Sequence, residues 1–151
     1  MAWSSVALWI LGEAKSGKSE LAEAMFARLP GKKFYIGTLP GTSKNMGTIK
    51  KHVDQRPKNW ELIEITDSLG AATKSIGWSG KNEVIAALLD GWGVYVRCRA
   101  SQWDKDNMEL TTTGEAHFVD AIYSEYRRLV DVCDYLVIVA HVSAPPCRFR
   151  L

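Results

Sequence analysis

Eight consecutive residues near the start of the chain have the types and spacing of a phosphate-binding loop. They fit the pattern G-x-x-x-x-G-K-S and run Gly12-Glu13-Ala14-Lys15-Ser16-Gly17-Lys18-Ser19. Glycine lets such a loop turn its backbone N–H groups around phosphate oxygens, Lys18 adds a positive charge, and Ser19 offers a hydroxyl to Mg²⁺. The alternative is a chance Gly/Lys/Ser turn. Because an apolar run precedes the loop and a helix-forming run follows it, the pattern predicts binding of a purine nucleoside triphosphate.

A second candidate for the same chemistry is Asp90, which ends the apolar run 84–89. A carboxylate at the end of a buried strand is where P-loop enzymes hold Mg²⁺ through water. The alternative is that Asp90 caps a helix or turn before Gly91. We favour the first interpretation and expect Ser19 and Asp90 to hold the metal together.

The segment 52–64 has an unusual composition, with His52 placed four residues before Arg56 and followed by Pro57 and Trp60. Composition alone favours a solvated basic helix with Trp60 packed into the core. A neutral imidazole can also act as a nucleophile that forms a phosphoramidate, and most histidines are largely neutral near pH 7. The residues by themselves leave both interpretations open.

The elements that must position these residues follow from the hydrophobic pattern. Short apolar runs predict strands, and runs with helical periodicity predict helices. We expect strands at 6–11, 33–37, 84–89 and 135–140 and helices at 18–29 and 118–132, with a weaker strand at 60–65, weaker helices at 48–54 and 68–76, an uncertain extended piece at 94–96 and a loop at 39–47. The run 86–89 could also pass as helix. Alternating strands and helices predict a three-layer α/β fold of the P-loop NTPase kind, whose mainly parallel sheet gathers ligand sites at the carboxyl ends of its strands.

Composition limits the other possibilities. The chain of 151 residues suits a single domain spanning 1–151, and 19 basic against 17 acidic residues give no case for nucleic acid as a partner. No apolar run approaches the roughly 20 residues needed to span a bilayer, and the apolar start lacks the features of a signal peptide. Three scattered cysteines and isolated histidines fit reduced thiols without a zinc site. We therefore expect a cytoplasmic protein with no membrane span.

Taken together, the motifs resemble the adenosylcobinamide kinase / adenosylcobinamide-phosphate guanylyltransferase family of cobalamin biosynthesis. The matching features occur in the family's order and at its spacings. They are Gly12 to Ser19 after the first strand, Tyr35-Ile36-Gly37-Thr38 at the end of the second, Ile49 with His52, Arg56-Pro57-x-x-Trp60-x-x-x-Glu64, and Leu88-Leu89-Asp90. The match is good over 6–96 and weak over 118–146.

The resemblance implies a bifunctional enzyme that uses ATP or GTP, with Mg²⁺, to phosphorylate adenosylcobinamide and then transfers GMP through a guanylylated histidine. It implies that His52 attacks the α-phosphate of GTP and that Lys18 and Arg56 assist catalysis. It places further residues against the nucleotide, namely Gly37, Thr38, Leu39, Val53, Asp54, Gln55 and Arg56, with Glu64 at the guanosine and Asp90 at the nucleotide or metal. It also implies a homo-oligomer.

The chain departs from the family at several positions. Glu13 and Lys15 stand where the family has glycine and arginine, Asp90-Gly91-Trp92-Gly93 replaces Asp-Cys-Leu-Thr, and Ala140 to Ser143 replace Asn-Glu-Val-Gly. The family continues after the position of Pro146 through another helix and strand, so we expect the fold to lack these and to leave an exposed sheet edge. Two alternatives follow: a shortened nucleotide-binding module with a regulatory or partner-binding role, and, more weakly, a P-loop kinase of another substrate.

Overall fold

The computed structural model describes residues 5–38, 47, 50, 54, 56–65, 68–79, 82–107 and 112–142. Its centre is one sheet of five strands, all paired in parallel, in the order β1-β5-β4-β2-β3. The strands are β1 (Val6–Gly12), β2 (Lys32–Gly37), β3 (Glu61–Glu64), β4 (Ile85–Asp90) and β5 (Tyr135–His141). The four expected strands and the weaker fifth are therefore confirmed.

Strand β4 lies in the middle of the sheet, which explains its composition. All five residues from Ile85 to Leu89 are buried, because helices cover both faces of the sheet. A strand that is apolar on both faces has no period-2 alternation, and this is why 86–89 could also pass as helix. That alternative is wrong, and the strand begins one residue later than expected and includes Asp90.

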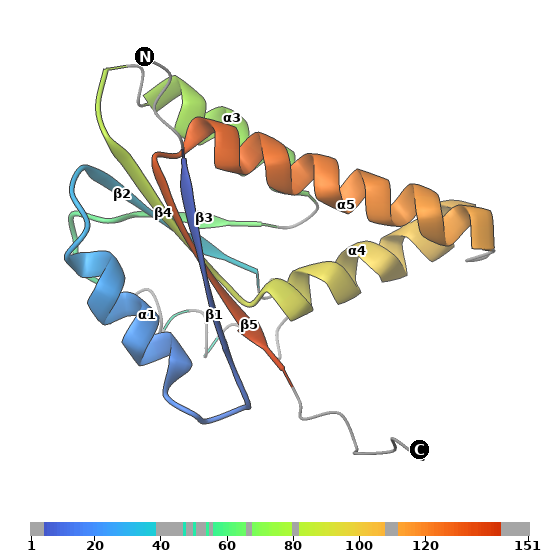
Figure 1. Ribbon diagram of the computed structural model, residues 1–151, viewed down its shortest axis with the longest axis horizontal. Helices are drawn as coiled ribbons and strands as arrows, with labels where there is room; N and C mark the ends of the chain where they lie inside the picture. Colours follow the sequence, from blue (N-terminus) through green and yellow to red (C-terminus); the bar gives the residue numbers. More distant parts are fainter. Residues whose placement is uncertain are drawn as a thin grey trace.

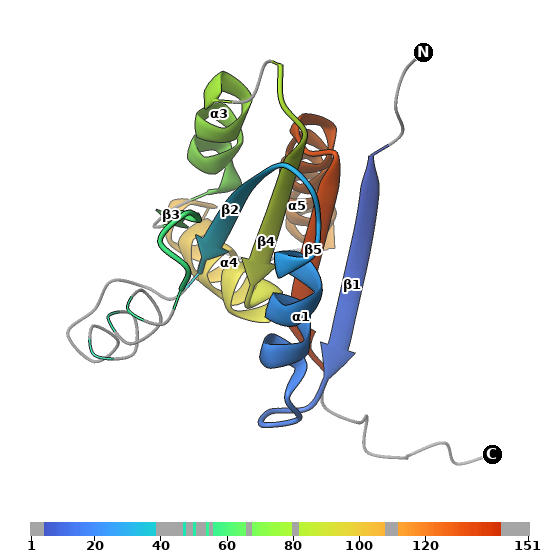
Figure 2. The same ribbon diagram turned by 90° about the vertical axis from the view of Figure 1, so that its left-hand side faces the viewer.

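Helices complete a three-layer arrangement around the sheet. Helix α1 (Lys18–Ala27) covers one face, and α3 (Leu69–Ser79), α4 (Trp92–Asn107) and α5 (Thr112–Val132) lie on the other (Figures 1 and 2). The α/β P-loop-like fold is thus confirmed. None of the helices described combines the length and the apolar character that crossing a bilayer requires.

Several boundaries differ from expectation, and α3 and α5 are longer than expected, since α3 ends at Ser79 and α5 begins at Thr112. Residues 94–96 belong to α4 and are not extended, because Gly91, with φ 97°, turns the chain and the Tyr95 N–H bonds the Gly91 carbonyl at 3.1 Å. Helix α1 ends at Ala27, where the Arg28 N–H bonds Met25 in a tighter turn. Gly47 is helical and not part of the loop, and the rest of the expected loop at 39–47 and most of the helix at 48–54 lie outside the described residues.

Two apolar clusters hold the layers together. One fills the space between the sheet and the α3–α5 layer, and the other lies beneath α1. Along β2 the side chains alternate between them, with Phe34 and Ile36 in the first cluster and Tyr35 in the second. The alternation places the Tyr35 side chain on the α1 face, near the phosphate-binding loop.

Candidate nucleotide-binding site

The segment from Gly12 to Ser19 has the strand–loop–helix context that a phosphate-binding loop requires. Lys15 has φ 58° and Gly17, at the start of α1, has φ 82°, so two loop residues adopt the left-handed conformation. For a lysine this conformation costs roughly 1–2 kcal/mol, and such outliers cluster at functional sites. A Cβ on Gly12 would lie 2.7 Å from the Ser16 Oγ, so a larger residue here would require that hydroxyl to rotate away.

Lys18 reaches back across this loop. Its Nζ donates a hydrogen bond of 2.8 Å to the backbone carbonyl of Glu13, a residue that is itself exposed. The ammonium group thereby lies over the loop, where a positive charge would meet bound phosphates.

The Asp90 carboxylate faces the loop from the end of β4. The Ser19 hydroxyl lies 3.5 Å from one Asp90 carboxylate oxygen, and the Tyr35 hydroxyl donates to the other at 3.2 Å. Asp90 therefore points toward α1 and β2, and its oxygens meet side chains of the site. These contacts favour the site interpretation over a cap of the turn before Gly91.

Ser19 and Asp90 offer the kind of oxygen ligands that Mg²⁺ prefers. Adjacent oxygen ligands of an octahedral Mg²⁺ at about 2.1 Å lie about 3 Å apart, and these two oxygens are 3.5 Å apart. A small movement, or an intervening water, lets both serve one ion. The described residues contain no group of three or more His, Cys, Asp or Glu that could hold a metal alone.

Arg56 is buried between Glu23 and Tyr35, the residue that donates to Asp90. Its Nη2 lies 2.9 Å from the Glu23 carboxylate on α1, and its guanidinium sits 4.1 Å from the centre of the Tyr35 ring. With 8% of its surface exposed, Arg56 is not on the solvated helix that composition favoured. Trp60 is buried as expected, with its ring 4.9 Å from that of Phe26. The chain that follows His52 is therefore anchored to α1 and β2.

Burial and nearby carboxylates shift the pKa values of this cluster upward. Desolvation raises the pKa of Glu23, assisted by Asp90 and Glu20, although the Arg56 charge opposes it. Desolvation, and then the Asp90 charge, also raise the pKa of Tyr35. Tyr35 thus remains protonated throughout the physiological pH range, and its hydroxyl donates a hydrogen bond to Asp90.

An open cavity of about 510 Å³ lies at the carboxyl ends of β4 and β5, within the volume range of small-molecule sites. It is lined by Lys18, Ser19, Asp90, Gly91, Gly93, Val94, Arg97, Val139 and His141. The expected gathering of Ser19, Gly37 and Asp90 on one edge of the sheet is confirmed, since Asp90 pairs with Gly37 in register.

The sequence pattern of a known family matches most of the chain, including all the strands and helices described above except the first two residues of β1. The pattern of cobinamide kinase / cobinamide phosphate guanyltransferase matches residues 8–141. The chain belongs to this family. A bifunctional adenosylcobalamin biosynthesis protein, CobP of Pseudomonas aeruginosa, is 37% identical over 73 residues, which are 48% of this chain and 42% of that protein. The chain thus matches less than half the length of this curated relative.

Solved structures similar to this chain support the fold. The assembled ATPase EscN of the type III secretion system of enteropathogenic E. coli matches with a TM-score of 0.61 and 11% identity, over 91% of this chain and 37% of that one. A prototypical ATPase from the type III secretion system of pathogenic bacteria gives the same TM-score and identity over 92% and 44%. At this identity the likeness shows the fold alone.

The structure describes several of the residues marked by the family resemblance. Gly37 pairs with Glu64, and a Cβ on Gly37 would lie 2.7 Å from a Glu64 carboxylate oxygen. Partial burial raises the pKa of Glu64 against the opposing Arg56 charge. Thr38 is buried, and its hydroxyl contacts the carbonyls of Asp90 at 3.0 Å and Gly91 at 2.9 Å. Thr38 therefore ties the end of β2 to the turn that carries Asp90.

Five family positions lie outside the described residues, namely Leu39, Ile49, His52, Val53 and Gln55. Asp54 is described as helical and exposed. The structure thus brings together the loop, Gly37, Thr38, Arg56, Glu64 and Asp90 at one edge of the sheet, and it leaves the position of the family's nucleophile as an expectation.

Four side chains at this edge were not among the predicted site residues: Glu23, Tyr35, Arg97 and His141. A signal existed for two of them. Tyr35 lies two residues before Gly37 and hence on the same face of β2, and His141 ends a strand whose carboxyl end was expected at the site. Glu23 and Arg97 lie in helices, where sequence alone does not show which face meets the cavity.

Proposed function

We propose that the chain is a cobinamide kinase and cobinamide-phosphate guanylyltransferase of cobalamin biosynthesis, which uses ATP or GTP with Mg²⁺. One observation carries the proposal: the Ser19 hydroxyl of a phosphate-binding loop and the Asp90 carboxylate lie 3.5 Å apart, in a chain of this family. The acceptor, adenosylcobinamide, and the GMP-carrying role of His52 rest on the family resemblance.

The chemistry assigns a task to each residue. In the kinase step, an acceptor hydroxyl attacks the γ-phosphorus and the nucleoside diphosphate leaves. In the transferase step, an imidazole nitrogen of His52 attacks the α-phosphorus of GTP; an N–P bond forms, the bond to the bridging oxygen breaks, and pyrophosphate leaves. The phosphate oxygen of the acceptor then attacks the same phosphorus, which releases His52 and joins GMP to the product.

The remaining residues bind and neutralise charge. Lys18 and the loop hold the phosphates, while Ser19 and Asp90 hold Mg²⁺, which neutralises the charge that develops on the leaving phosphates. Arg56 adds positive charge beside the site and fixes the chain four residues after His52. Gly37, Thr38, Leu39, Val53, Asp54 and Gln55 lie against the nucleotide in this proposal, with Glu64 at the guanosine.

The covalent intermediate gives the sharpest test. After incubation with Mg²⁺ and GTP, mass spectrometry should find GMP on His52 as a phosphoramidate, labile in acid and stable in base. His52→Ala should abolish the adduct, whereas His117→Ala, which changes an exposed histidine on α5, should retain it. Lys18→Ala should weaken GTP binding by about 1.5–3 kcal/mol, because it removes a charge-assisted contact.

Two failures of this experiment have different meanings. If the parent protein binds GTP but forms no adduct between neutral and mildly alkaline pH, the transferase role is wrong and a nucleotide-binding module is the better account. If Lys18→Ala binds GTP as tightly as the parent, the loop itself is not the nucleotide site.

The proposal includes self-association in the cytoplasm. Among the described strands β1 pairs only with β5, so its outer edge is open, and Val6, Leu8 and Leu11 on it are 53%, 39% and 59% exposed. An open apolar edge favours pairing with another chain. Sedimentation should show an oligomer that Leu8→Lys dissociates, and a monodisperse monomer at high concentration would contradict the proposal. The free thiols of Cys98 and Cys133 suit a reducing compartment.

A further inference from the structure

Two side chains in the cavity have no role in the function proposed so far. Arg97 projects from α4 and His141 ends β5, and both line the cavity together with Lys18 and Asp90. Both residues are exposed, and Arg97 forms no ion pair with any residue in the described part of the chain. A cavity that already contains the loop lysine therefore holds a second basic group, which has no carboxylate partner within the described part of the chain.

The position of His141 is fixed by strand pairing. His141 lies beside Gly12 in the β1–β5 register, and the Val142 N–H bonds the Gly12 carbonyl at 3.0 Å. Asp90 pairs with Val139, two residues earlier on β5, so the side chains of Asp90 and His141 leave the sheet on the same face. His141 thus stands next to the first residue of the phosphate-binding loop, on the side of the metal-binding carboxylate.

Arg97 approaches from the other wall of the cavity. Gly93, Val94 and Arg97 lie on one face of α4, because residues three and four apart are neighbours on a helix. Gly93 has no side chain, and a Cβ built there would meet nothing within 4 Å. The helix therefore leaves open space on the face from which the guanidinium borders the cavity.

The charges of the cavity indicate the class of ligand. Lys18, Arg97 and the imidazole of His141 supply N–H donors, and Asp90 is the one carboxylate among the lining residues. Mg²⁺ at Asp90 would offset that carboxylate. A guanidinium offers paired donors in the geometry of phosphate oxygens, and an imidazole adds a third donor. The matching ligand is a terminal phosphate group with two negative charges.

We propose that Arg97 and His141 form a second anion site, opposite Lys18, that binds a terminal phosphate group. This inference rests on the proposed function in that the loop holds the nucleotide. The phosphate has two possible sources with the same chemistry: the outermost phosphate of the nucleoside triphosphate, or the phosphate monoester of the phosphorylated acceptor. The two sources predict different binding data.

The test compares three proteins, the parent, Arg97→Ala and His141→Gln, by calorimetry in the presence of Mg²⁺. For each protein it measures the affinity for GTP, the affinity for GDP, and the affinity of the GDP-loaded protein for methyl phosphate. If the site holds the outermost nucleotide phosphate, Arg97→Ala weakens GTP about tenfold to hundredfold and leaves GDP within about twofold. If it holds the acceptor phosphate, GTP and GDP are unchanged and methyl phosphate binding is lost. Arg97→Lys should bind the same ligand better than Arg97→Ala but less tightly than the parent, since lysine keeps the positive charge but lacks the paired N–H donors of the guanidinium.

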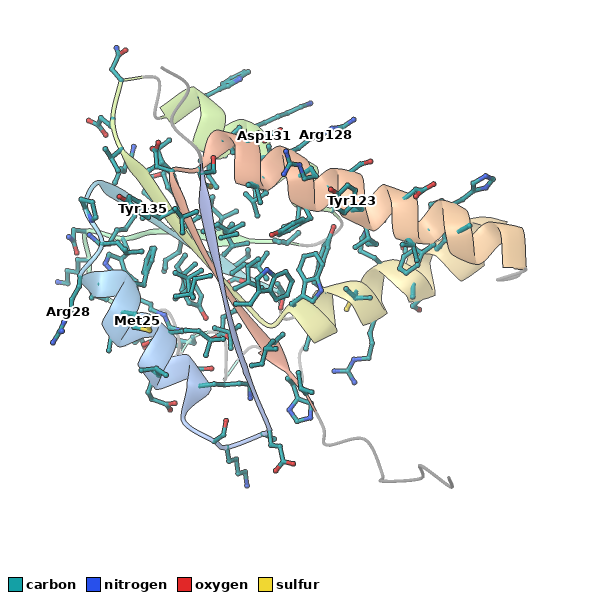
Figure 3. All side chains as sticks on the ribbon, viewed as in Figure 1. Met25, Arg28, Tyr123, Arg128, Asp131 and Tyr135 are labelled. Carbon is teal, nitrogen blue, oxygen red and sulfur yellow. The ribbon has the colours of Figure 1, made fainter. Side chains whose placement is uncertain are left out.

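Matched controls come from α5. Arg128→Ala and His117→Gln remove the same groups from exposed positions outside the cavity, and Figure 3 shows Arg128 near the end of α5 that lies away from the carboxyl edge. The proposal is overturned if Arg97→Ala and His141→Gln change none of the three affinities, or change them no more than the controls.

A separate result identifies failure of the proposed function. If the parent binds neither GTP nor GDP, the loop is not the nucleotide site, and methyl phosphate is then titrated into nucleotide-free protein. Binding that depends on Arg97 under those conditions supports the anion site on its own, and its absence overturns it.

Discussion

Replacing Asp90 with asparagine should uncouple Mg²⁺ from nucleotide binding. The substitution keeps the shape of the side chain and an oxygen that can accept the Tyr35 hydrogen bond, now 3.2 Å long. It removes the negative charge that lies 3.5 Å from the Ser19 hydroxyl. The variant therefore tests the charge of Asp90 separately from its packing.

The structure sets the size of the effect. In the proposed site, Asp90 would give the ion one carboxylate and Ser19 one hydroxyl, so the carboxylate would be the charged member of this pair of ligands. Interactions with charged groups of this kind contribute about 1.5–3 kcal/mol. The loss corresponds to roughly a tenfold to 150-fold weaker affinity for Mg²⁺-GTP.

The assay compares the dissociation constant of GTP in Mg²⁺ with that in EDTA, by calorimetry. In the parent, Mg²⁺ should lower the dissociation constant of GTP. In Asp90→Asn, the ratio of the dissociation constants in EDTA and in Mg²⁺ should be smaller by roughly tenfold to 150-fold. In EDTA the variant should bind GTP as well as the parent or better, because a carboxylate no longer repels the phosphates. Asp131→Asn, which changes an exposed side chain on α5 that Figure 3 labels, is the matched control. If Mg²⁺ tightens GTP binding by the same factor in the parent and in Asp90→Asn, Asp90 is not a ligand of the metal.

Three further predictions concern the scaffold. Gly31→Ala should destabilise the fold by about 2–5 kcal/mol in urea unfolding, because Gly31 has φ 96° and a Cβ would lie 2.1 Å from the Val84 carbonyl oxygen. Phe26→Ala should cost about 3–5 kcal/mol by the same measurement, since the ring is fully buried against Trp60. Burial raises the pKa of the Cys133 thiol from 9.0 to about 12. Because the unfolded chain loses this proton first, the free energy of unfolding should fall as the pH rises above 9.0 toward about 12. A urea midpoint that stays constant over that pH range in both the parent and Cys133→Ala would contradict this.

Local sequence was enough to predict the parts of the site that depend on neighbours along the chain. The loop from Gly12 to Ser19 needs only a strand before it and a helix after it, and both have clear patterns. Asp90 follows from the rule that parallel strands present ligands at their carboxyl ends. These predictions hold because each rests on a short segment whose structure its own residues largely determine.

Other parts of the site depend on contacts between distant segments, and composition predicted them wrongly or not at all. Arg56 lies in a basic, polar stretch, and nothing in that stretch indicates burial. Its surroundings come from Glu23 on α1 and Tyr35 on β2, more than twenty residues away in each case. Helix α4 was missed for a related reason, because the turn at Gly91 is stabilised by Thr38 at the end of β2.

The contacts of Arg56 explain why this position suits arginine. Its guanidinium stacks on the Tyr35 ring through its face and pairs with Glu23 through its edge, and only a planar cation can do both at once. Tyr35 in turn donates to Asp90, so the segment that follows His52 is joined through two side chains to the carboxylate that faces Ser19. A shift of that segment would move Tyr35 and alter how Asp90 is held. The segment that follows His52 and the edge of the site that carries Asp90 are therefore linked through Arg56 and Tyr35.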